Sequence, residues 1–364
     1  MAKNLSLRDD GVRPLKHSLD LWDGSKWDAA SLQSRLDADG YLFVPGLLPQ
    51  GVSRSLGEKC VDVIKKAGWL AGGQQAGRQP RPGFWTSHRE KLYDDTLDKT
   101  ALIPEYHTLP HDKDVLAFFS SLFGKAPFLL PNYAASAYFP VTPDRLDMTT
   151  AQHQEFFAMP ASRQMLVLWT PLHTCPLPEG PLLVAEGSHK NGMWPLKLHL
   201  TEFGGVQTDG DFSGSWRGSD MNAGDALIFS CFTVHKALRN ISDNIRLSMS
   251  YKIQPEGEPV SDTSAANLMR HRPSGQPWAK IYEAGVPVEN QYYWQRLSHT
   301  VVPRDWSLTR TSYELAIDEA GRGNFAAMGL LRSIVKTKLF DDLIAPAHRL
   351  IGEFEQQLHR AGLR

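Results

Sequence analysis

Three residues in the middle of the chain have the types and the spacing of a metal site. A histidine and a carboxylate, His153 and Glu155, stand two positions apart in the run AQHQEF. If that run is a strand, both side chains lie on one face, because successive side chains alternate. A third ligand has to come from elsewhere, and His235 follows the apolar segment 226–230 across a short connection. Two histidines and one carboxylate leave three adjacent positions open on iron(II), enough for a bidentate oxo acid and dioxygen.

A second group of residues suits the far end of such an oxo acid. The run RLSMSY begins at Arg246 and has the alternation of a strand, so that Arg246 and Ser248 share a face. A guanidinium can bind a carboxylate through two parallel hydrogen bonds, and a neighbouring hydroxyl supplies a third donor. We therefore expect these two residues to bind the distal carboxylate of a dicarboxylate cosubstrate.

Each of these residues has a simpler interpretation when taken alone. A His-x-Glu triplet arises by chance in many proteins, and a lone Arg246 is more often a surface charge. The joint order and spacing on strand-like segments favour a site. Two alternatives stay open at this point: a metal-binding protein without turnover, and a zinc hydrolase, in which Arg246 and Ser248 would have no evident task.

The segments that must position these residues have the pattern of a β protein. Between residues 126 and 254, short apolar or alternating runs are separated by Gly, Pro, Asp and Asn, as in an antiparallel barrel or jelly roll. The runs are FLLPNYAASAYF, TAQHQEFFAM, RQMLVLWTPL, PLLVAEGS, DALIFSCF and IRLSMSYKI. We expect a mainly β protein with flanking helices, whose core is a double-stranded β-helix of the cupin-like jelly-roll type.

Helical patterns flank this region on both sides. Residues 28–68 predict a helix, a strand and a helix, and residues 113–123 predict a helix that ends at Gly124. Residues 307–361 contain two or three further helical patterns. The predicted organisation is therefore N-terminal helical and strand elements (1–125) packed on the barrel, a catalytic core (126–255) and a C-terminal helical extension (256–364).

The composition of the chain limits the classes of molecule that it is expected to bind. Lys and Arg number 39 against 40 for Asp and Glu, so no overall field attracts nucleic acid or an anionic membrane, and a small-molecule substrate is expected. The oligomeric state is not determined. The N-terminal residues lack the apolar core of a secretory signal, no run of about 18 apolar residues occurs, and the three cysteines are widely spaced. These features predict a cytoplasmic protein with reduced thiols and without a membrane partner.

Motifs between about residues 38 and 254 resemble the phytanoyl-CoA dioxygenase family of iron(II)- and 2-oxoglutarate-dependent oxygenases. The sequence DGYLFVPGLL resembles its N-terminal signature, HQEFF its metal-binding segment, and PEGPLLVAEGSHK its Gly-Pro-Leu and Gly-Ser-His loop. HKALRNISDNIRLS reproduces the spacing of its distal His, Asn, Ser and Arg. The resemblance implies iron(II) at His153, Glu155 and His235, and 2-oxoglutarate at Arg246 and Ser248 with Trp169 of LVLWTPL beside it.

The reaction that the resemblance implies consumes O2 and 2-oxoglutarate, releases succinate and CO2, and oxidises a small-molecule metabolite, usually by hydroxylation. Glu155 departs from the Asp that the family usually has. Halogenating relatives have a small residue there, so Glu155 argues against halogenation, and a centre of two histidines is the alternative to test. Asn240 and Ser242 are turn formers, expected to fix the reversal that places His235 and Arg246 on neighbouring strands.

Two long segments have no assigned task. Residues 71–90 and 193–223 fit either a lid over the pocket or variable surface loops. If Arg78 or Arg81 faced the pocket, an anionic substrate would follow. His173 lies near two prolines and is expected to serve core packing.

Overall fold

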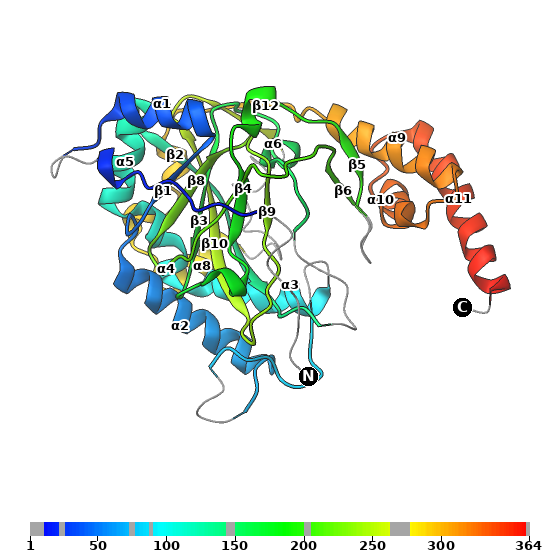
Figure 1. Ribbon diagram of the computed structural model, residues 1–364, viewed down its shortest axis with the longest axis horizontal. Helices are drawn as coiled ribbons and strands as arrows, with labels where there is room; N and C mark the ends of the chain where they lie inside the picture. The colour runs from blue at the N-terminus through cyan, green and yellow to red at the C-terminus, as the bar shows by residue number, and fades with distance from the viewer. Residues whose placement is uncertain are drawn as a thin grey trace.

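Two antiparallel sheets form the centre of the computed structural model, which describes residues 11–21, 26–72, 77–86, 90–142, 150–199, 205–262 and 277–361 (Figure 1). The large sheet has the order β1-β8-β3-β10-β2, with β1 at Tyr41–Val44, β8 at Ala226–Ser230, β3 at Leu166–Pro171, β10 at Arg246–Pro255 and β2 at Pro127–Tyr138. The small sheet has the order β7-β4-β9, with β7 at Trp216–Arg217, β4 at Leu182–Ala185 and β9 at His235–Ala237. Every strand pairing in these two sheets is antiparallel.

An apolar cluster lies between the two sheets. It takes alternate residues from the large sheet and from β4 of the small sheet, because alternation sends every second side chain to the same face. Its members are Leu15, Tyr41, Phe43, Val167, Trp169, Leu182, Val184, Met221, Leu227 and Phe229. The sheets therefore pack face to face, and the inner face of each is available to build a site.

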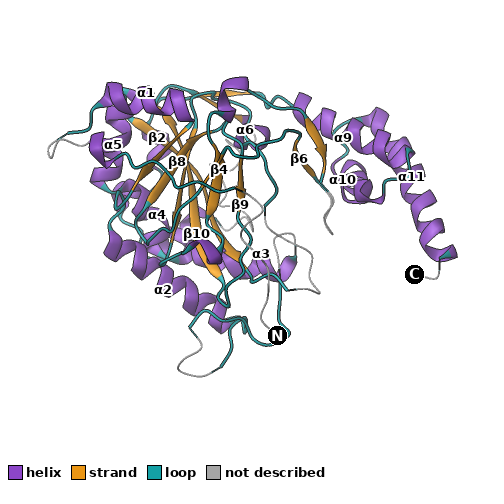
Figure 2. Cartoon of the chain, viewed as in Figure 1, coloured by secondary structure: helices purple, strands orange, loops and turns teal. Residues whose placement is uncertain are grey.

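Helices cover the other face of the large sheet, as Figures 1 and 2 show. They are α1 (Ala29–Asp39), α2 (Gln50–Lys66), α3 (Lys91–Leu97), α4 (Pro104–Thr108), α5 (Lys113–Phe123) and α8 (Trp278–Glu283). The predicted helix-strand-helix unit is confirmed by α1, β1 and α2. The prediction for α5 is also confirmed, and Gly124 ends it in the left-handed conformation, at a φ of 63°.

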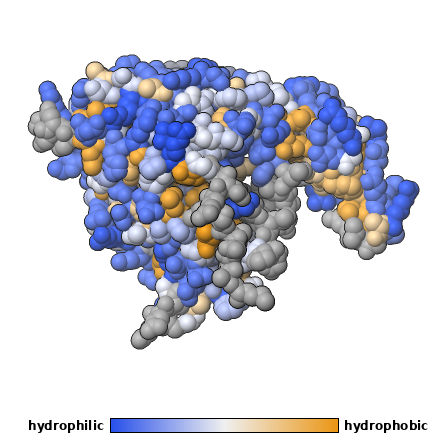
Figure 3. Space-filling model, viewed as in Figure 1, coloured by the Kyte–Doolittle hydropathy of each residue, from blue (hydrophilic) through white to orange (hydrophobic). Residues whose placement is uncertain are grey.

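The C-terminal helices form a separate unit that projects from the body (Figure 1). These are α9 (Ser307–Gly321), α10 (Met328–Thr337) and α11 (Asp341–Arg360), and they pack beside the pair β5 (Leu196–Leu198) and β6 (Val206–Thr208). They have an apolar core of their own, to which β5 contributes Leu198. Apolar residues also reach the surface of this unit (Figure 3). Phe325 is one of the exposed large apolar residues. A short parallel pair, β11 (Pro259–Ser261) with β12 (Thr300–Val302), completes the described strands.

One predicted strand is wrong. The run 150–159 forms only an isolated bridge at His153 and then a short helix, α6 (Glu155–Ala158). The chain turns there because the Phe156 N–H donates to the Cys231 carbonyl (3.1 Å), which ends any extended pairing. The other five predicted runs contain strands β2, β3, β4, β8 and β10.

The three cysteines, Cys60, Cys175 and Cys231, are buried and unpaired, as the sequence predicted. No helix in the described ranges is long and apolar enough to cross a membrane. The division of the chain near residues 125 and 255 stays a prediction. β1 from the N-terminal part nevertheless pairs with β8, so that part contributes a strand to the large sheet.

Gly57 of α2 offers a test of how closely the helical layer packs on the sheet. A Cβ at this position would lie 2.2 Å from the Leu172 carbonyl oxygen, whereas one at Gly51 of the same helix meets nothing within 4 Å. We expect Gly57→Ala to lower the free energy of unfolding by about 1–3 kcal/mol through overpacking. Gly51→Ala is the matched control and should be neutral or slightly stabilising. Denaturant unfolding of both variants measures the difference, and equal stabilities would contradict the close contact.

Candidate metal centre

His153 and His235 are joined by a two-bond antiparallel bridge. The His153 N–H donates to the His235 carbonyl, and the His235 N–H donates to the His153 carbonyl, each at 3.0 Å. Residues paired in this way lie directly opposite each other with their side chains on the same side. The two imidazole centroids are accordingly 4.1 Å apart. His235 opens β9, after the turn that follows β8, where the sequence placed it.

Backbone carbonyls fix the orientation and tautomer of both imidazoles. His153 donates its Nδ1–H to the Ala151 carbonyl (2.7 Å), and His235 donates its Nδ1–H to the Thr233 carbonyl (3.0 Å). Burial, followed by the neighbouring His153, lowers the pKa of His235 to about 3, so its ring is neutral. The His235 ring therefore presents a lone pair on Nε2, which is the form that binds a metal.

Glu155 completes the cluster from the first position of α6. One ligand atom from each of His153, Glu155 and His235 lies within 4.8 Å of the others, and Glu155 Oε2 is 3.8 Å from His235 Nε2. The proximity that the sequence predicted occurs, but the reason given for it was wrong, because Glu155 begins a helix instead of continuing a strand. Two imidazoles and one carboxylate form a donor set suited to a divalent transition metal.

Lys252 of β10 approaches the same carboxylate. Its Nζ lies 3.4 Å from Glu155 Oε1, and the lysine side chain is almost fully buried. Burial raises the pKa of Glu155, but the Lys252 ammonium outweighs it with help from the two histidines, and the pKa is lowered to about 2. Glu155 is therefore ionised. Sequence reasoning missed Lys252, although the polar residues at every second position of β10 would have indicated it.

Gln154, between the two ligand candidates, anchors the segment. Its side chain is buried and points to the opposite side, where Nε2 donates to the carbonyls of Gly192 (2.7 Å) and Phe232 (2.6 Å). Its Oε1 accepts from the Trp194 N–H (2.8 Å). The amide is thus fully engaged with two other segments, and this holds His153 and Glu155 in register with the turn before β9.

Arg246 and Ser248 lie side by side on the inner face of β10, as predicted. Both are buried, and the Arg246 Nε and the Ser248 Oγ have no hydrogen-bond partner among the residues that the structure describes. Arg246 Nη1 donates to the Gly180 carbonyl. Gly180 has a φ of 76°, and a Cβ there would lie 2.3 Å from the Leu238 carbonyl oxygen, so only glycine fits this close approach. A carboxylate bound at this face could accept hydrogen bonds from both of these buried donors.

Aromatic rings enclose the Arg246 guanidinium. Its central carbon lies 4.1 Å from the centroid of Tyr138 on β2 and 5.5 Å from the centroid of Trp169 on β3. Trp169 pairs with Ser250 across the sheet and therefore shares the inner face with Arg246. The rings stabilise the cation and leave it few directions in which to bind an anion.

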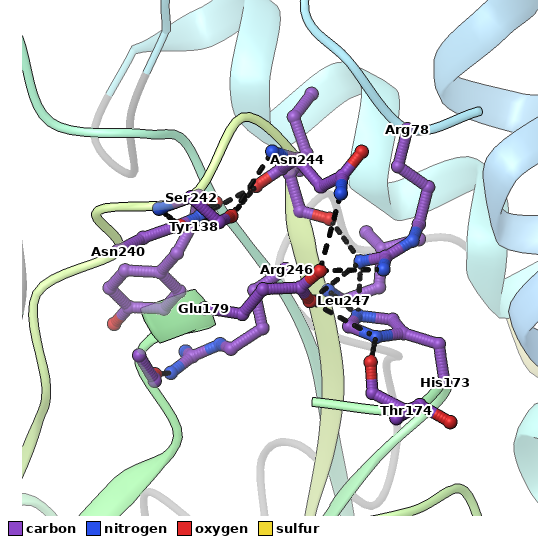
Figure 4. A network of polar contacts seen from close by, with 12 residues as sticks. Arg78, Tyr138, His173, Thr174, Glu179, Asn240, Ser242, Asn244, Arg246 and Leu247 are labelled. Atoms are coloured by element: carbon purple, nitrogen blue, oxygen red, sulfur yellow. Dashed lines mark hydrogen bonds and ion pairs between the residues drawn. The ribbon is translucent and has the colours of Figure 1, made fainter. Parts of the chain in front are cut away.

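A polar network fixes the start of β10 on either side of Arg246 (Figure 4). Arg78 forms a two-pronged ion pair with Glu179 (3.0 and 3.1 Å) and donates to the Ile245 carbonyl (2.7 Å). The Leu247 N–H donates to His173 Nε2 (2.9 Å). Sequence reasoning considered Arg78 as a pocket cation, but Glu179 neutralises it, and it considered His173 a packing residue, but that side chain holds the backbone beside Arg246.

The turn before Arg246 is fixed as predicted, but the strands it joins lie in different sheets. Asn240 Nδ2 donates to the carbonyls of Asn244 (2.7 Å) and Tyr138 (3.0 Å), and Ser242 donates to Asn240 Oδ1 (2.7 Å). These bonds close the reversal (Figure 4). His235 and Arg246 are nevertheless not on neighbouring strands, because β9 pairs with β4 in the small sheet and β10 belongs to the large one.

The two segments considered as lids are described only in part. Residues 73–76 and 87–89 of the first, and 200–204 of the second, lie outside the described residues. Arg81 lies over the Phe84 ring, with its guanidinium carbon 5.2 Å from the centroid. The described part of the second segment forms β5, β6 and β7. The lid function of both segments stays a prediction.

Comparison with known proteins gives a family match. The profile for phytanoyl-CoA dioxygenase (PhyH) matches residues 36–248, more than half of the chain. The 1-deoxypentalenic acid 11-beta-hydroxylase of Streptomyces arenae is 26% identical over 247 residues, which cover 63% of this chain and 82% of that protein. The protein of the same name from Streptomyces exfoliatus is 27% identical over 247 residues, with the same shares covered.

Solved structures with some similarity include the epimerase SnoN in complex with Fe3+, alpha ketoglutarate and nogalamycin RO. It aligns with a TM-score of 0.43 and 22% identity over 68% of this chain and 94% of that one. EvdO2 from Micromonospora carbonacea var. aurantiaca, complexed with 2-oxoglutarate, aligns with a TM-score of 0.46 and 17% identity over 61% and 89%. Because both scores are below 0.5, the family assignment rests on the sequence match.

Substitution of Gln154 tests whether its side chain holds the segment that carries His153 and Glu155. In Gln154→Ala, the Gly192 and Phe232 carbonyls and the Trp194 N–H lose their partner, at a cost of about 1–3 kcal/mol for each buried group. We expect a Tm lower by several degrees and divalent-metal affinity reduced by about 10- to 100-fold, as for other residues that orient ligands. Gln164→Ala, at an exposed glutamine, is the control for both measurements. Unchanged Ni(II) affinity in Gln154→Ala would show that the anchoring has no effect on the cluster.

Proposed function

The chain belongs to the phytanoyl-CoA dioxygenase family of iron(II)- and 2-oxoglutarate-dependent oxygenases, and on this premise we propose that His153, Glu155 and His235 hold its iron. The observation that carries the proposal is the convergence of two imidazole nitrogens and one ionised carboxylate within 4.8 Å. The backbone carbonyls that fix both imidazoles support it, because ligating histidines usually donate their other N–H in this way. Family membership favours an enzyme over a binding protein without turnover.

The architecture supports a double-stranded β-helix of the jelly-roll type as the fold that carries the site. Such a fold consists of two antiparallel sheets that face each other across a core. The five-stranded and three-stranded sheets, with the apolar cluster between them, have this arrangement. The ligand candidates lie at one end, where β9 begins and the chain enters α6.

Arg246 and Ser248 would bind the distal carboxylate of 2-oxoglutarate. The unpartnered Arg246 Nε and Ser248 Oγ are buried on one face, so the fit is supported by chemistry as well as by position. A charge-assisted bond to this guanidinium is strong because Tyr138 and Trp169 keep water away from it. Trp169 would form one wall of the cosubstrate pocket.

The chemistry that iron(II), 2-oxoglutarate and O2 supply together is the oxidation of a substrate C–H bond, coupled to conversion of 2-oxoglutarate to succinate and CO2. We propose hydroxylation of a small molecule, in which one oxygen atom of O2 enters the C–H bond and the other enters succinate. The residues of this chain orient the ligands, bind the carboxylate and exclude water. Gln154 and the Ala151 and Thr233 carbonyls hold the three ligand side chains in place before anything binds.

Arg246→Ala tests the cosubstrate clamp. Removing one partner of a buried charge pair costs about 2–5 kcal/mol, or roughly 30- to 4,000-fold in affinity. We expect a loss of that order in 2-oxoglutarate affinity, measured by titration of the Mn(II)-loaded protein, while Mn(II) itself still binds. Arg246→Lys keeps the positive charge but cannot form two parallel hydrogen bonds, so its loss of 2-oxoglutarate affinity should be intermediate. Wild-type 2-oxoglutarate affinity in Arg246→Ala would overturn the clamp.

Substitution of Glu155 distinguishes a metal centre of two histidines and one carboxylate from a centre of two histidines alone. If Glu155 is a ligand, Glu155→Ala removes a charge and a bond from iron, so bound iron and succinate formation should both fall by more than the 10- to 100-fold loss typical of residues outside the ligand set. Glu155→Asp should keep measurable activity. In a two-histidine centre, Glu155→Ala would bind iron nearly as the wild type does. Iron content and succinate formation distinguish these outcomes.

His235→Ala tests the distal ligand. A ligand that binds only the native state raises Tm by mass action, so Ni(II) with 2-oxoglutarate should stabilise the wild type. We expect His235→Ala to lose this response, because two of the three ligands cannot hold the metal with comparable affinity. The matched control is His189→Ala, since His189 lies in a short 3-10 helix (Ser188–Asn191) and donates to the Asp37 carbonyl. A full thermal shift in His235→Ala would assign the distal ligand to another residue.

A further inference from the structure

Polar residues line the inner face of β10, and the proposed cosubstrate clamp uses only the first two of them; the last one, Gln254, donates to the carbonyls of Glu258 and Pro259. Arg246, Ser248, Ser250 and Lys252 stand at alternate positions, whereas the residues between them are buried and apolar on the opposite face. Burial of an ammonium group is costly unless it is paired and hydrogen-bonded. The buried charge of Lys252 therefore needs an explanation beyond the clamp.

The contacts of Lys252 satisfy it only in part. Its Nζ lies 3.4 Å from Glu155 Oε1 and donates to Ser250 Oγ at 3.2 Å. An ammonium has three N–H donors, and no third acceptor for this one is found in the described part of the chain. Its cross-strand neighbours on β3 and β2, Val167 and Leu130, are apolar and cannot supply one.

The charges of the loaded site do not cancel. The two positive charges of iron(II) and the two negative charges of 2-oxoglutarate cancel. Arg246 and Lys252 are both buried cations, and Glu155 supplies one negative charge against their two positive charges. One positive charge is left over. The neighbouring Arg78–Glu179 pair is neutral in itself. Arg163 lies over the Phe232 ring near α6, with its guanidinium carbon 4.6 Å from the centroid, and adds positive rather than negative potential.

The wall beside Arg246, Ser248 and Ser250 is partly exposed. Tyr138, Ser136 and Ala134 of β2 pair with Arg246, Ser248 and Ser250, so they share the inner face. All three are only partly buried, in contrast to the β10 residues Arg246 and Ser248 opposite them.

This row therefore borders accessible space, and it leads along β2 toward the bulge opposite Ser250 and Lys252. Ser250, whose Oγ accepts a hydrogen bond from the Lys252 ammonium, connects this row to the lysine.

We propose that Lys252 binds a carboxylate of the substrate, so that the enzyme acts on small molecules with one negative charge. This inference rests on the proposed function, because Glu155 is shared with the metal only if it is a ligand. The third Lys252 N–H would donate to the substrate carboxylate, and the single residual charge would be neutralised. A dianion such as a phosphate monoester would leave an excess negative charge and is not favoured.

The test compares acids with their amides in the Ni(II)-loaded full chain with saturating 2-oxoglutarate, which fills the Arg246 site. The probes are benzoate, cyclohexanecarboxylate and decanoate, each against the corresponding amide, with thermal-shift titration as the readout. We expect at least one acid to bind the wild type about tenfold or more tightly than its amide. Lys252→Met and Lys252→Gln should abolish that preference, and Lys252→Arg should keep it. Lys197→Met, at an exposed lysine of β5, is the matched control and should not change it.

The outcomes separate this inference from the function on which it rests. A wild type that shows the 2-oxoglutarate response but no preference for any acid over its amide would overturn the carboxylate assignment alone. The same holds if the preference persists in both neutral variants. If the wild type shows no stabilisation by Ni(II) with 2-oxoglutarate, the proposed function itself fails. Two neutral variants are used in case one of them fails to fold. Lys252→Gln keeps a hydrogen-bond donor to Glu155.

Discussion

The short bridge between His153 and His235 is the interaction on which the candidate centre depends. Two backbone hydrogen bonds of 3.0 Å bring together segments that are far apart in the chain and place their imidazoles on one side. The Ser188 hydroxyl reinforces the bridge, because it accepts from the Val234 N–H next to His235. The site is thus defined by backbone geometry, and side-chain rotamers adjust only the last few ångströms.

Polar groups inside an otherwise apolar sandwich impose the second constraint. Arg246 and Lys252 lie on the inner face of a strand whose other face is mainly apolar, so each cation requires polar or aromatic groups of its own nearby. Arg246 has two aromatic rings and the Gly180 carbonyl, and Lys252 has Glu155 and Ser250. Both arrangements leave donors unused. Such incompletely satisfied groups destabilise a protein unless a ligand binds them, which is the usual compromise at a functional site.

The C-terminal helices pack around an apolar cluster that is not part of the core between the two sheets. The part of the chain that matches the family profile, residues 36–248, ends before they begin. They reach the body through β5 and β6, which belong to the segment before the distal histidine. The candidate metal centre therefore lies outside these helices, which are joined to one of the two segments that could cover the site.

Local signals in the sequence determined much of this protein. Alternation identified β10 with Arg246 and Ser248, the glycine stop at Gly124 fixed the end of α5, and the motif spacing brought His153 and His235 together as candidates. Tertiary contacts decided the rest. Glu155 begins a helix where the Phe156 N–H bonds the distant Cys231 carbonyl, and Lys252 meets Glu155 through a contact between segments far apart in the chain. The assignment of β9 and β10 to different sheets was equally undetermined, since an exposed backbone edge specifies no partner until the whole chain has packed.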